Sequence, residues 1–137
     1  MKVLVATDGS EKSMKAVEKA VELAVKEGAQ VTLMSVALYA KDYVDDMPPN
    51  IQDKLEAEAA AALNKAKARF DEKSLKVEAV LEAGVDPANN IIRRAEEGKY
   101  DLLLLGASGV HGLGKLLMGS TAAKVTANAP CDVTVVR

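Results

Sequence analysis

Strand-like and helix-like patterns alternate along the whole chain. Short apolar runs with few polar interruptions are typical of strands buried on both faces of a parallel sheet. We expect five such strands, over residues 3–6, 31–36, 76–82, 101–105 and 132–136. Apolar residues recur at helical spacing between them, in segments bounded by residues 10 and 28, 51 and 70, 86 and 98, and 119 and 130. This alternation predicts an α/β domain.

Capping residues mark several of the predicted boundaries. Ser10 and Asp86 precede helical segments and carry the oxygen-bearing side chains preferred at helix N-caps, and Pro87 suits the first helical position. Gly28 follows the last residue of the first helical pattern, as expected at a helix C-terminus. We expect Gly84 to break the third strand after residue 82.

The expected fold is one doubly wound, Rossmann-like domain over residues 1–137, with helices on both faces of a five-stranded parallel sheet. The chain of 137 residues, with 49% hydrophobic content, has the size and apolar fraction of one ordinary domain with its own core. Right-handed crossovers place the connecting helices on both faces. In such sheets ligands bind outside the carboxyl ends of the strands, where the direction of winding reverses.

Composition and charge argue against several classes of partner. The chain has 18 Lys and Arg against 20 Asp and Glu, a net charge of −2, with the two signs interleaved along the predicted helices. Aromatic residues make up 3% and Trp is absent, so we expect no nucleic-acid partner. The apolar runs are shorter than the ~20 residues that span a membrane, so we expect no membrane partner. Asp8 interrupts the first apolar stretch, unlike in a signal peptide, and the lone Cys131 fits the cytoplasmic localisation that we expect.

Two glycine-bearing turns follow the apolar run 102–105. Gly106 and Gly109 are followed, after nine residues, by Gly119-Ser120-Thr121. A glycine at the end of a buried strand lets backbone and ligand approach closely, because it lacks a Cβ atom. Free backbone N–H groups at the start of the last helix, the helix dipole and two hydroxyl groups favour an anion. The spacing therefore predicts a nucleotide phosphate site.

Two other motifs overlap this segment, and neither is complete. Residues 109–115 match the first seven positions of a P-loop, but Leu116 stands where a Ser or Thr hydroxyl would bind Mg²⁺. The dinucleotide-binding pattern G-x-G-x-x-G begins at Gly112 and fails at Leu117. Each glycine could also serve only as a turn residue, and Asp8 could be a turn residue that caps the following helix. The complete spacing favours the phosphate site.

The glycine spacing resembles that of the universal stress protein family, whose ATP-binding members carry Gly, two residues, Gly, nine residues and then Gly-Ser or Gly-Thr. The resemblance extends to Val3–Ser10 and Ala129–Arg137, and so covers the whole chain. It implies the strand order 3-2-1-4-5 and a ligand that is ATP, or AMP or ADP, with Mg²⁺. It also implies a homodimer joined through the C-terminal strand, which lies at a sheet edge in that order and is rich in valine.

The resemblance also assigns roles to individual residues. Asp8 and Val36 would contact the nucleoside, Val36 through its backbone, and Leu105 is also assigned to the nucleotide-binding set. The ribose and phosphates would be held by the motif residues Gly106, Gly109, Gly119, Ser120 and Thr121. No catalytic residue is assigned, and we expect a nucleotide-dependent regulator of the stress response. The alternatives are a slow ATPase or nucleotidyl-transfer enzyme, and a family member that has lost nucleotide binding and only dimerises.

A few positions depart from the family pattern or have two interpretations. Val110 stands where a basic residue often follows the second motif glycine, which removes one possible phosphate contact. His111 is the only histidine, so no transition-metal site is implied and a solvated loop position is favoured over a catalytic one. The loop over residues 39–50 is either a solvated connection or a lid over bound nucleotide. Its acidic residues are Asp42, Asp45 and Asp46.

Overall fold

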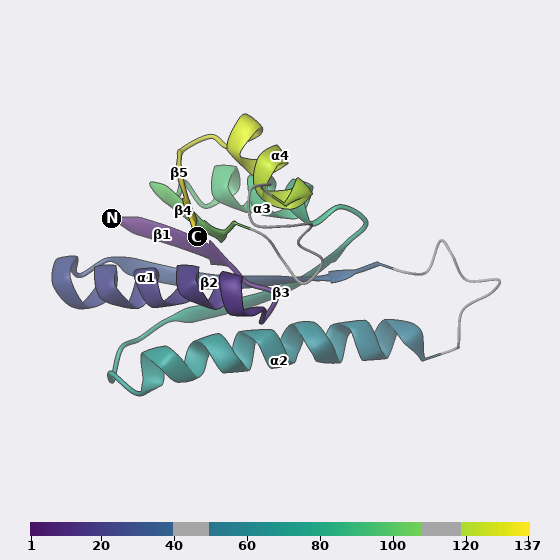
Figure 1. Cartoon of the computed structure of the whole chain (residues 1–137), viewed down its shortest axis with the longest axis horizontal. Helices are drawn as coiled ribbons and strands as arrows, with labels where there is room; N and C mark the ends of the chain where they lie inside the picture. Colours follow the sequence, from purple (N-terminus) through teal and green to yellow (C-terminus); the bar gives the residue numbers. More distant parts are fainter. Residues whose placement is uncertain (40–49, 108–118) are drawn as a thin grey trace.

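A parallel sheet with the order β3-β2-β1-β4-β5 forms the centre of the protein (Figure 1). The computed structural model describes residues 1–39, 50–107 and 119–137. The strands are β1 (Lys2–Ala6), β2 (Gln30–Leu38), β3 (Glu78–Gly84), β4 (Leu102–Gly106) and β5 (Asp132–Val136). The helices are α1 (Glu11–Glu27), α2 (Ile51–Asp71), α3 (Pro87–Glu97) and α4 (Ser120–Asn128). The expected fold class and strand order are confirmed.

The helices form two layers, with α1 and α2 on one face of the sheet and α3 and α4 on the other (Figure 1). Successive side chains of a strand point to opposite faces, so β1 contributes Val3 and Val5 to the first core and Leu4 to the second. All three are fully buried, as expected of the central strand of a parallel sheet.

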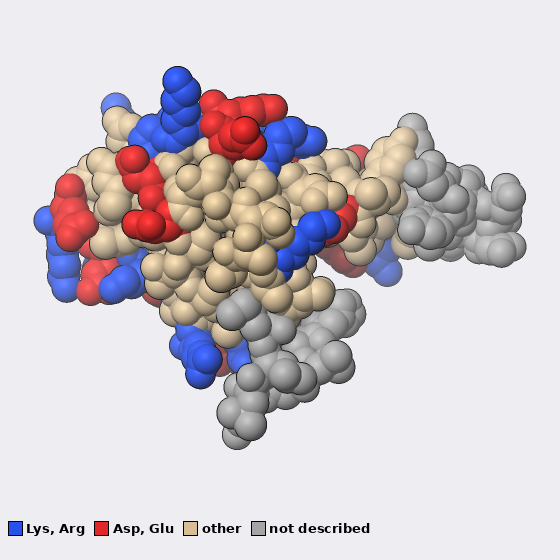
Figure 2. All heavy atoms as spheres, turned by 90° about the horizontal axis from the view of Figure 1, so that it is seen from above, with Lys and Arg blue, Asp and Glu red and all other residues tan. Residues whose placement is uncertain are grey.

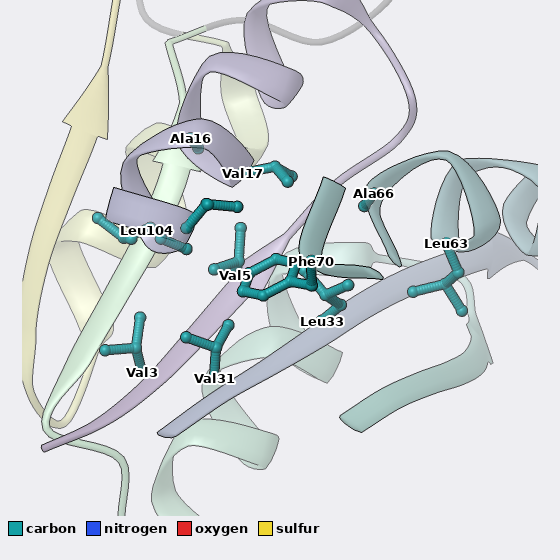
Figure 3. Close-up of a cluster of buried hydrophobic side chains, with 12 residues drawn as sticks. Val3, Val5, Ala16, Val17, Val31, Leu33, Leu63, Ala66, Phe70 and Leu104 are labelled. Carbon is teal, nitrogen blue, oxygen red and sulfur yellow. The ribbon is translucent and has the colours of Figure 1, made fainter. Parts of the chain in front are cut away.

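The core under α1 and α2 is built around Phe70, the only phenylalanine of the chain (Figure 3). Phe70 lies at the end of α2 and packs among aliphatic side chains of the strands and of α1. Its labelled neighbours in this cluster include Val5, Val17, Val31 and Leu33. The opposite core lacks an aromatic ring among its fully buried members and uses Leu103, Ile91, Val125 and small alanines. Both faces of the sheet are therefore covered by apolar side chains.

The local helix signals act as the sequence predicts. The Ser10 hydroxyl accepts a hydrogen bond from the N–H of Ser13 at 3.2 Å, and Asp86 accepts one from the N–H of Ala88 at 3.1 Å. Pro87 occupies the first position of α3. Gly28 ends α1 with a φ of 65°, the left-handed conformation that glycine adopts without a Cβ penalty.

Strand β3 differs from the expected range and lies two residues later, over Glu78–Gly84. Gly84 does not break the strand but pairs with Leu38, and the N–H of Tyr39 donates to the Gly84 carbonyl at 3.0 Å. The missing side chain of Gly84 instead allows close packing against α3. A Cβ atom on Gly84 would lie 2.1 Å from Oδ1 of Asn90, so glycine makes room for a helix side chain over the strand.

Charged side chains of both signs lie close together on the face shown in Figure 2. Blue and red groups adjoin one another around the rim, as the interleaved charges of the sequence predict. The ion pairs of the protein include Lys26 with Glu22 at 2.8 Å and Lys67 with Asp71 at 3.4 Å. The expectation that nucleic acid is not a partner stays a prediction.

Candidate functional site

The carboxyl ends of β1 and β4 lie side by side at the point where the winding of the sheet reverses. The chain continues from β1 toward β2 and β3 on one side, and β4 and β5 occupy the other side. Residues Thr7 to Gly9 follow β1 and Ala107 follows β4 at this edge. The N–H of Thr7 donates to the carbonyl of Met34 at 2.9 Å, which ties the first turn to β2. Doubly wound sheets bind their ligands in a crevice at this position.

The two halves of the glycine motif meet at this edge. The N–H of Gly119 donates to the carbonyl of Ala107 at 2.8 Å, and the N–H of Ala107 donates to the carbonyl of Val136 at 2.9 Å. Gly119 is the N-cap residue of α4, and no described side chain caps this helix start. Ser120 is exposed and Thr121 is half-buried. Because the first N–H groups of an α-helix lack intrahelical partners, the start of α4 offers donors beside the end of β4.

Gly106 is required by the close packing of a neighbouring helix, and the ligand contact inferred from the sequence stays a prediction. A Cβ atom at this position would lie 2.8 Å from the carbonyl carbon and oxygen of Lys12 and from Cα of Ser13. The first turn of α1 thus packs directly on the backbone of β4. Gly119 needs no special backbone conformation, because its φ of −60° and ψ of 155° are open to any residue.

Asp8 occupies an ordered turn at the crevice. Its Oδ1 accepts a hydrogen bond from the N–H of Ser10 at 2.9 Å, and the side chain is exposed. Gly9 has a φ of 80°, and its carbonyl accepts a hydrogen bond from Nζ of Lys65 at 3.0 Å. Asp8 therefore has the turn role that the sequence allowed, but the N-cap of α1 is Ser10.

Val36 and Leu105 lie near the crevice with their side chains packed in the core under α3 and α4. Val36 is half-buried on β2, two residues beyond Met34, which pairs with the last residue of β1. Leu105 is 4% exposed and pairs with Val135. The backbone contact assigned to Val36 stays a prediction.

The remaining candidates lie outside the described residues. They are Gly109 of the motif, Val110, His111, the P-loop-like segment up to Leu116, and the acidic residues Asp42, Asp45 and Asp46. The structure therefore brings together Asp8, Val36, Leu105, Gly106 and the Gly119-Ser120-Thr121 segment at one edge of the sheet.

Sequence reasoning missed Ser13 and Lys65. Ser13 is 5% exposed and its hydroxyl lies 2.8 Å from that of Thr7. A signal was present, because Ser10 and Ser13 place an N-cap hydroxyl three residues before a second hydroxyl in the first turn of α1. Lys65 reaches the turn from α2, far along the chain, and no local pattern indicates that contact.

The Glu82 carboxylate and three donor side chains of α3 hold α3 against β3, beside the strand that carries Val36. Glu82 pairs with Val36 in the sheet register, and its side chain is 14% exposed. Its Oε1 accepts from Nδ2 of Asn90 at 2.9 Å and from Nη2 of Arg93 at 2.8 Å, and its Oε2 from Nη2 of Arg94 at 2.7 Å. Burial alone would raise the pKa of Glu82, but these donors outweigh it and hold the pKa below its ordinary value.

Two other ionisable groups have shifted pKa values near α4. The Lys124 ammonium, 2.6 Å from Oδ2 of Asp86, lowers the pKa of that carboxyl and links α4 to the N-cap of α3. Burial, with smaller effects from Asp132 and Asp101, raises the pKa of the Cys131 thiol. A raised thiol pKa agrees with the interpretation of Cys131 as a packed and unreactive side chain.

Comparison with known proteins identifies the family. The family model described as the universal stress protein family matches residues 1–137. The chain belongs to the universal stress protein family. A universal stress protein of Methanocaldococcus jannaschii is 35% identical over 143 residues, which cover 99% of this chain and 81% of the relative.

Solved universal stress proteins share the fold of this one. UspA from Lactobacillus plantarum superimposes with a TM-score of 0.85 at 28% identity, covering 100% of this chain and 97% of that chain. A universal stress protein solved in complex with cAMP gives a TM-score of 0.76 at 26% identity, covering 100% and 97% of the two chains. Within the described segments of the present universal stress protein, no helix is long and apolar enough to cross a membrane.

Proposed function

We propose that this universal stress protein binds ATP, or AMP or ADP, at the carboxyl ends of β1 and β4 and acts as a cytoplasmic, nucleotide-dependent regulator of the stress response. The hydrogen bond from Gly119 to the Ala107 carbonyl carries the proposal, because it joins the two halves of the glycine motif beside Asp8. The solved relative with bound cAMP adds support, since its ligand is an adenine nucleotide.

Each candidate residue has a role that its position permits. Asp8 and the backbone of Val36 would face the nucleoside, and Leu105 would contribute backbone groups. The ribose and phosphates would be held by Gly106, Gly109, Gly119, Ser120 and Thr121. Backbone donors at the start of α4 suit a phosphate better than a neutral group, because the helix dipole favours negative charge there.

Mg²⁺ would bind at this site together with the phosphates of the nucleotide. Among the described residues no group of three or more His, Cys, Asp or Glu side chains could hold a metal ion. Mg²⁺ prefers oxygen ligands and commonly uses one or two carboxylates plus substrate phosphates. Asp8 and the hydroxyl groups of Ser120 and Thr121 are oxygen donors of that kind. When bound, the ion would neutralise phosphate charge.

Titration calorimetry with ATP, ADP and GTP tests the proposal. We expect measurable binding of the adenine nucleotides and weaker binding of GTP, with and without Mg²⁺. Nucleotide released from freshly purified, denatured protein gives a second measurement. The absence of binding heat at millimolar ATP, for protein shown to be folded, would refute nucleotide binding.

Gly119→Val is expected to abolish ATP binding with the fold intact. The N-cap conformation of Gly119 accepts a valine, so the new side chain acts by occupying the space that the phosphates need. Ser120→Ala should weaken binding by only about 0.5–1.5 kcal/mol, because it removes one hydroxyl hydrogen bond and keeps the backbone donors. Calorimetry on both folded variants measures the difference. Equal losses would show that the hydroxyl, rather than the helix start, provides the main contact.

We also propose a homodimer joined through β5. This strand lies at a sheet edge, and its Val136 carbonyl accepts from Ala107 on the β4 side. Backbone groups of alternate residues in a parallel strand point to opposite neighbours, so the N–H of Val135 points to the open edge. Antiparallel pairing of two such edges about a two-fold axis would satisfy both and close the assembly.

Val135→Pro is expected to convert the dimer into a folded monomer. The proline removes the outward N–H that the partner strand needs but leaves the β4–β5 hydrogen bonds in place. Val135→Ala is the matched control, because it shortens the same side chain and keeps the N–H. Light scattering at tens of micromolar measures the mass. A monomeric native protein, or a proline variant that stays dimeric, would exclude β5 pairing.

A further inference from the structure

Ser13 is a buried hydroxyl at the junction of the two strands that form the crevice. Its Oγ lies 2.8 Å from Oγ1 of Thr7, 3.1 Å from the Ser10 carbonyl oxygen and 3.4 Å from the backbone N of Asp8. Thr7 and Ser13 are each 5% exposed. The N–H of Gly9 donates to Oγ1 of Thr7 at 3.1 Å.

One arrangement of the protons satisfies every group in this set. Ser13 donates its single proton to the Ser10 carbonyl and accepts from the Thr7 hydroxyl and the Asp8 N–H. Thr7 then accepts from the Gly9 N–H. Two buried hydroxyl groups thus bind the backbone of the turn: that of Ser13 accepts from the N–H of Asp8, and that of Thr7 accepts from the N–H of Gly9. Removing the Ser13 oxygen would leave Thr7 and the Asp8 N–H without this acceptor.

The backbone of Ser13 simultaneously meets the other strand of the crevice. Its Cα is one of the atoms that would lie 2.8 Å from a Cβ on Gly106, together with the carbonyl of Lys12. The same residue therefore contacts the Asp8 turn through its side chain and the end of β4 through its main chain.

We infer that Ser13 is a positioning residue that sets the Asp8 turn relative to Gly106 and thereby the affinity of the site for an adenine nucleotide. This inference rests on the proposed function. Ser13 itself is buried below the turn and acts through Asp8 and Gly106, which would face the ligand. Because the Asp8 turn and the backbone at Gly106 are already ordered before binding, less binding free energy is lost in ordering them.

Ser13→Ala and Thr32→Val form a matched pair for the test. Each removes one buried hydroxyl, since Thr32 is 6% exposed and its Oγ1 accepts from the Tyr100 hydroxyl at 2.8 Å. Thr32 pairs with Leu4 in the amino-terminal half of β2, away from the crevice. Similar losses of thermal stability are expected for both. Ser13→Ala should weaken ATP binding about fivefold to tenfold, as expected for loss of a buried hydrogen bond, whereas Thr32→Val should change it less than about twofold.

Amide exchange measured without nucleotide gives a second result that does not depend on binding. In Ser13→Ala the amides of Asp8 and Gly9 should exchange faster than in the native protein and in Thr32→Val. Ser13→Cys replaces the hydroxyl oxygen with a somewhat larger sulfur that is a weaker acceptor, and should give intermediate affinity and exchange. If Ser13→Ala does not fold, Ser13→Cys takes its place in both measurements.

The outcomes separate the two proposals. Native protein that fails to bind adenine nucleotide refutes the proposed function, and with it the effect of Ser13 on affinity. Native binding with equal affinity losses in Ser13→Ala and Thr32→Val, or unchanged exchange at Asp8 and Gly9, refutes the role of Ser13 and leaves nucleotide binding standing. Selective loss of affinity together with faster exchange supports it.

Discussion

Gly106→Ala is expected to destabilise the protein by about 1–3 kcal/mol, the usual cost of overpacking a filled core, and to abolish adenine-nucleotide binding. The new methyl group would lie 2.8 Å from backbone atoms of Lys12 and Ser13, which cannot rotate away as a side chain can. The first turn of α1 must therefore move off β4, and the Asp8 turn moves with it. Urea denaturation measures the stability, and calorimetry measures ATP binding.

Gly28→Ala is the matched control at the other end of α1. A Cβ atom there meets nothing within 4 Å, so the substitution acts only through the positive φ of 65°. We expect a loss of about 1–2 kcal/mol in stability, the cost of the left-handed conformation, with ATP binding unchanged. If Gly106→Ala leaves binding unchanged, the position of α1 on β4 does not shape the site.

Glu82→Gln is expected to destabilise the protein by about 1.5–3 kcal/mol at neutral pH, the range measured for hydrogen bonds to charged groups. The substitution leaves Arg93 and Arg94 without the carboxylate that both contact, on a side chain only 14% exposed. It also replaces one of the two acceptor oxygens by an NH2 group, which cannot accept a hydrogen bond. Urea denaturation between pH 3 and pH 8 measures the effect.

The pH dependence follows from the lowered pKa of Glu82. A carboxyl whose pKa is lower in the folded state stabilises the protein fully above its unfolded pKa, about 4.3 for glutamate, and loses that contribution as pH falls through the folded value. The difference in free energy of unfolding between native protein and Glu82→Gln should therefore be constant from pH 8 to about pH 6 and become smaller in acid. Glu78→Gln, at an exposed glutamate of the same strand, should show little difference at any pH. A difference independent of pH would contradict the charge-based explanation.

The sequence predicts the fold wherever the deciding interactions are local. The alternation of short apolar runs with helical patterns indicates the parallel sheet, and Ser10, Gly28 and Asp86 mark helix ends because their caps involve residues two to four positions away. Strand β3 was less predictable, since its range depends on register with β2. Gly84 joins that ladder although its lack of a side chain suggests a break.

The sequence predicts which residues form the candidate site, but not the contacts among them. The glycine motif follows a strand and opens a helix, and in the structure the N–H of Gly119 donates to the carbonyl of Ala107. The close approach of Lys12 to Gly106 joins residues far apart in the chain, so no local pattern predicts it. The contacts of Ser13 with Thr7, and of Lys65 with Gly9, likewise depend on the tertiary structure.

The central place of β1 imposes an order on folding during synthesis. This first strand pairs with β2 and β4, and the N–H of Asp101 donates to the Lys2 carbonyl at 2.8 Å across almost the whole chain. The segment from β1 to α3 is synthesised before β4, so one edge of β1 stays unpaired and the Leu4 side of the sheet lacks the contacts of β4 and α4. In a nascent chain stalled before residue 102, the edge of β1 that pairs with β4 has no partner strand. Such an unpaired apolar edge is prone to aggregate and to recruit chaperones.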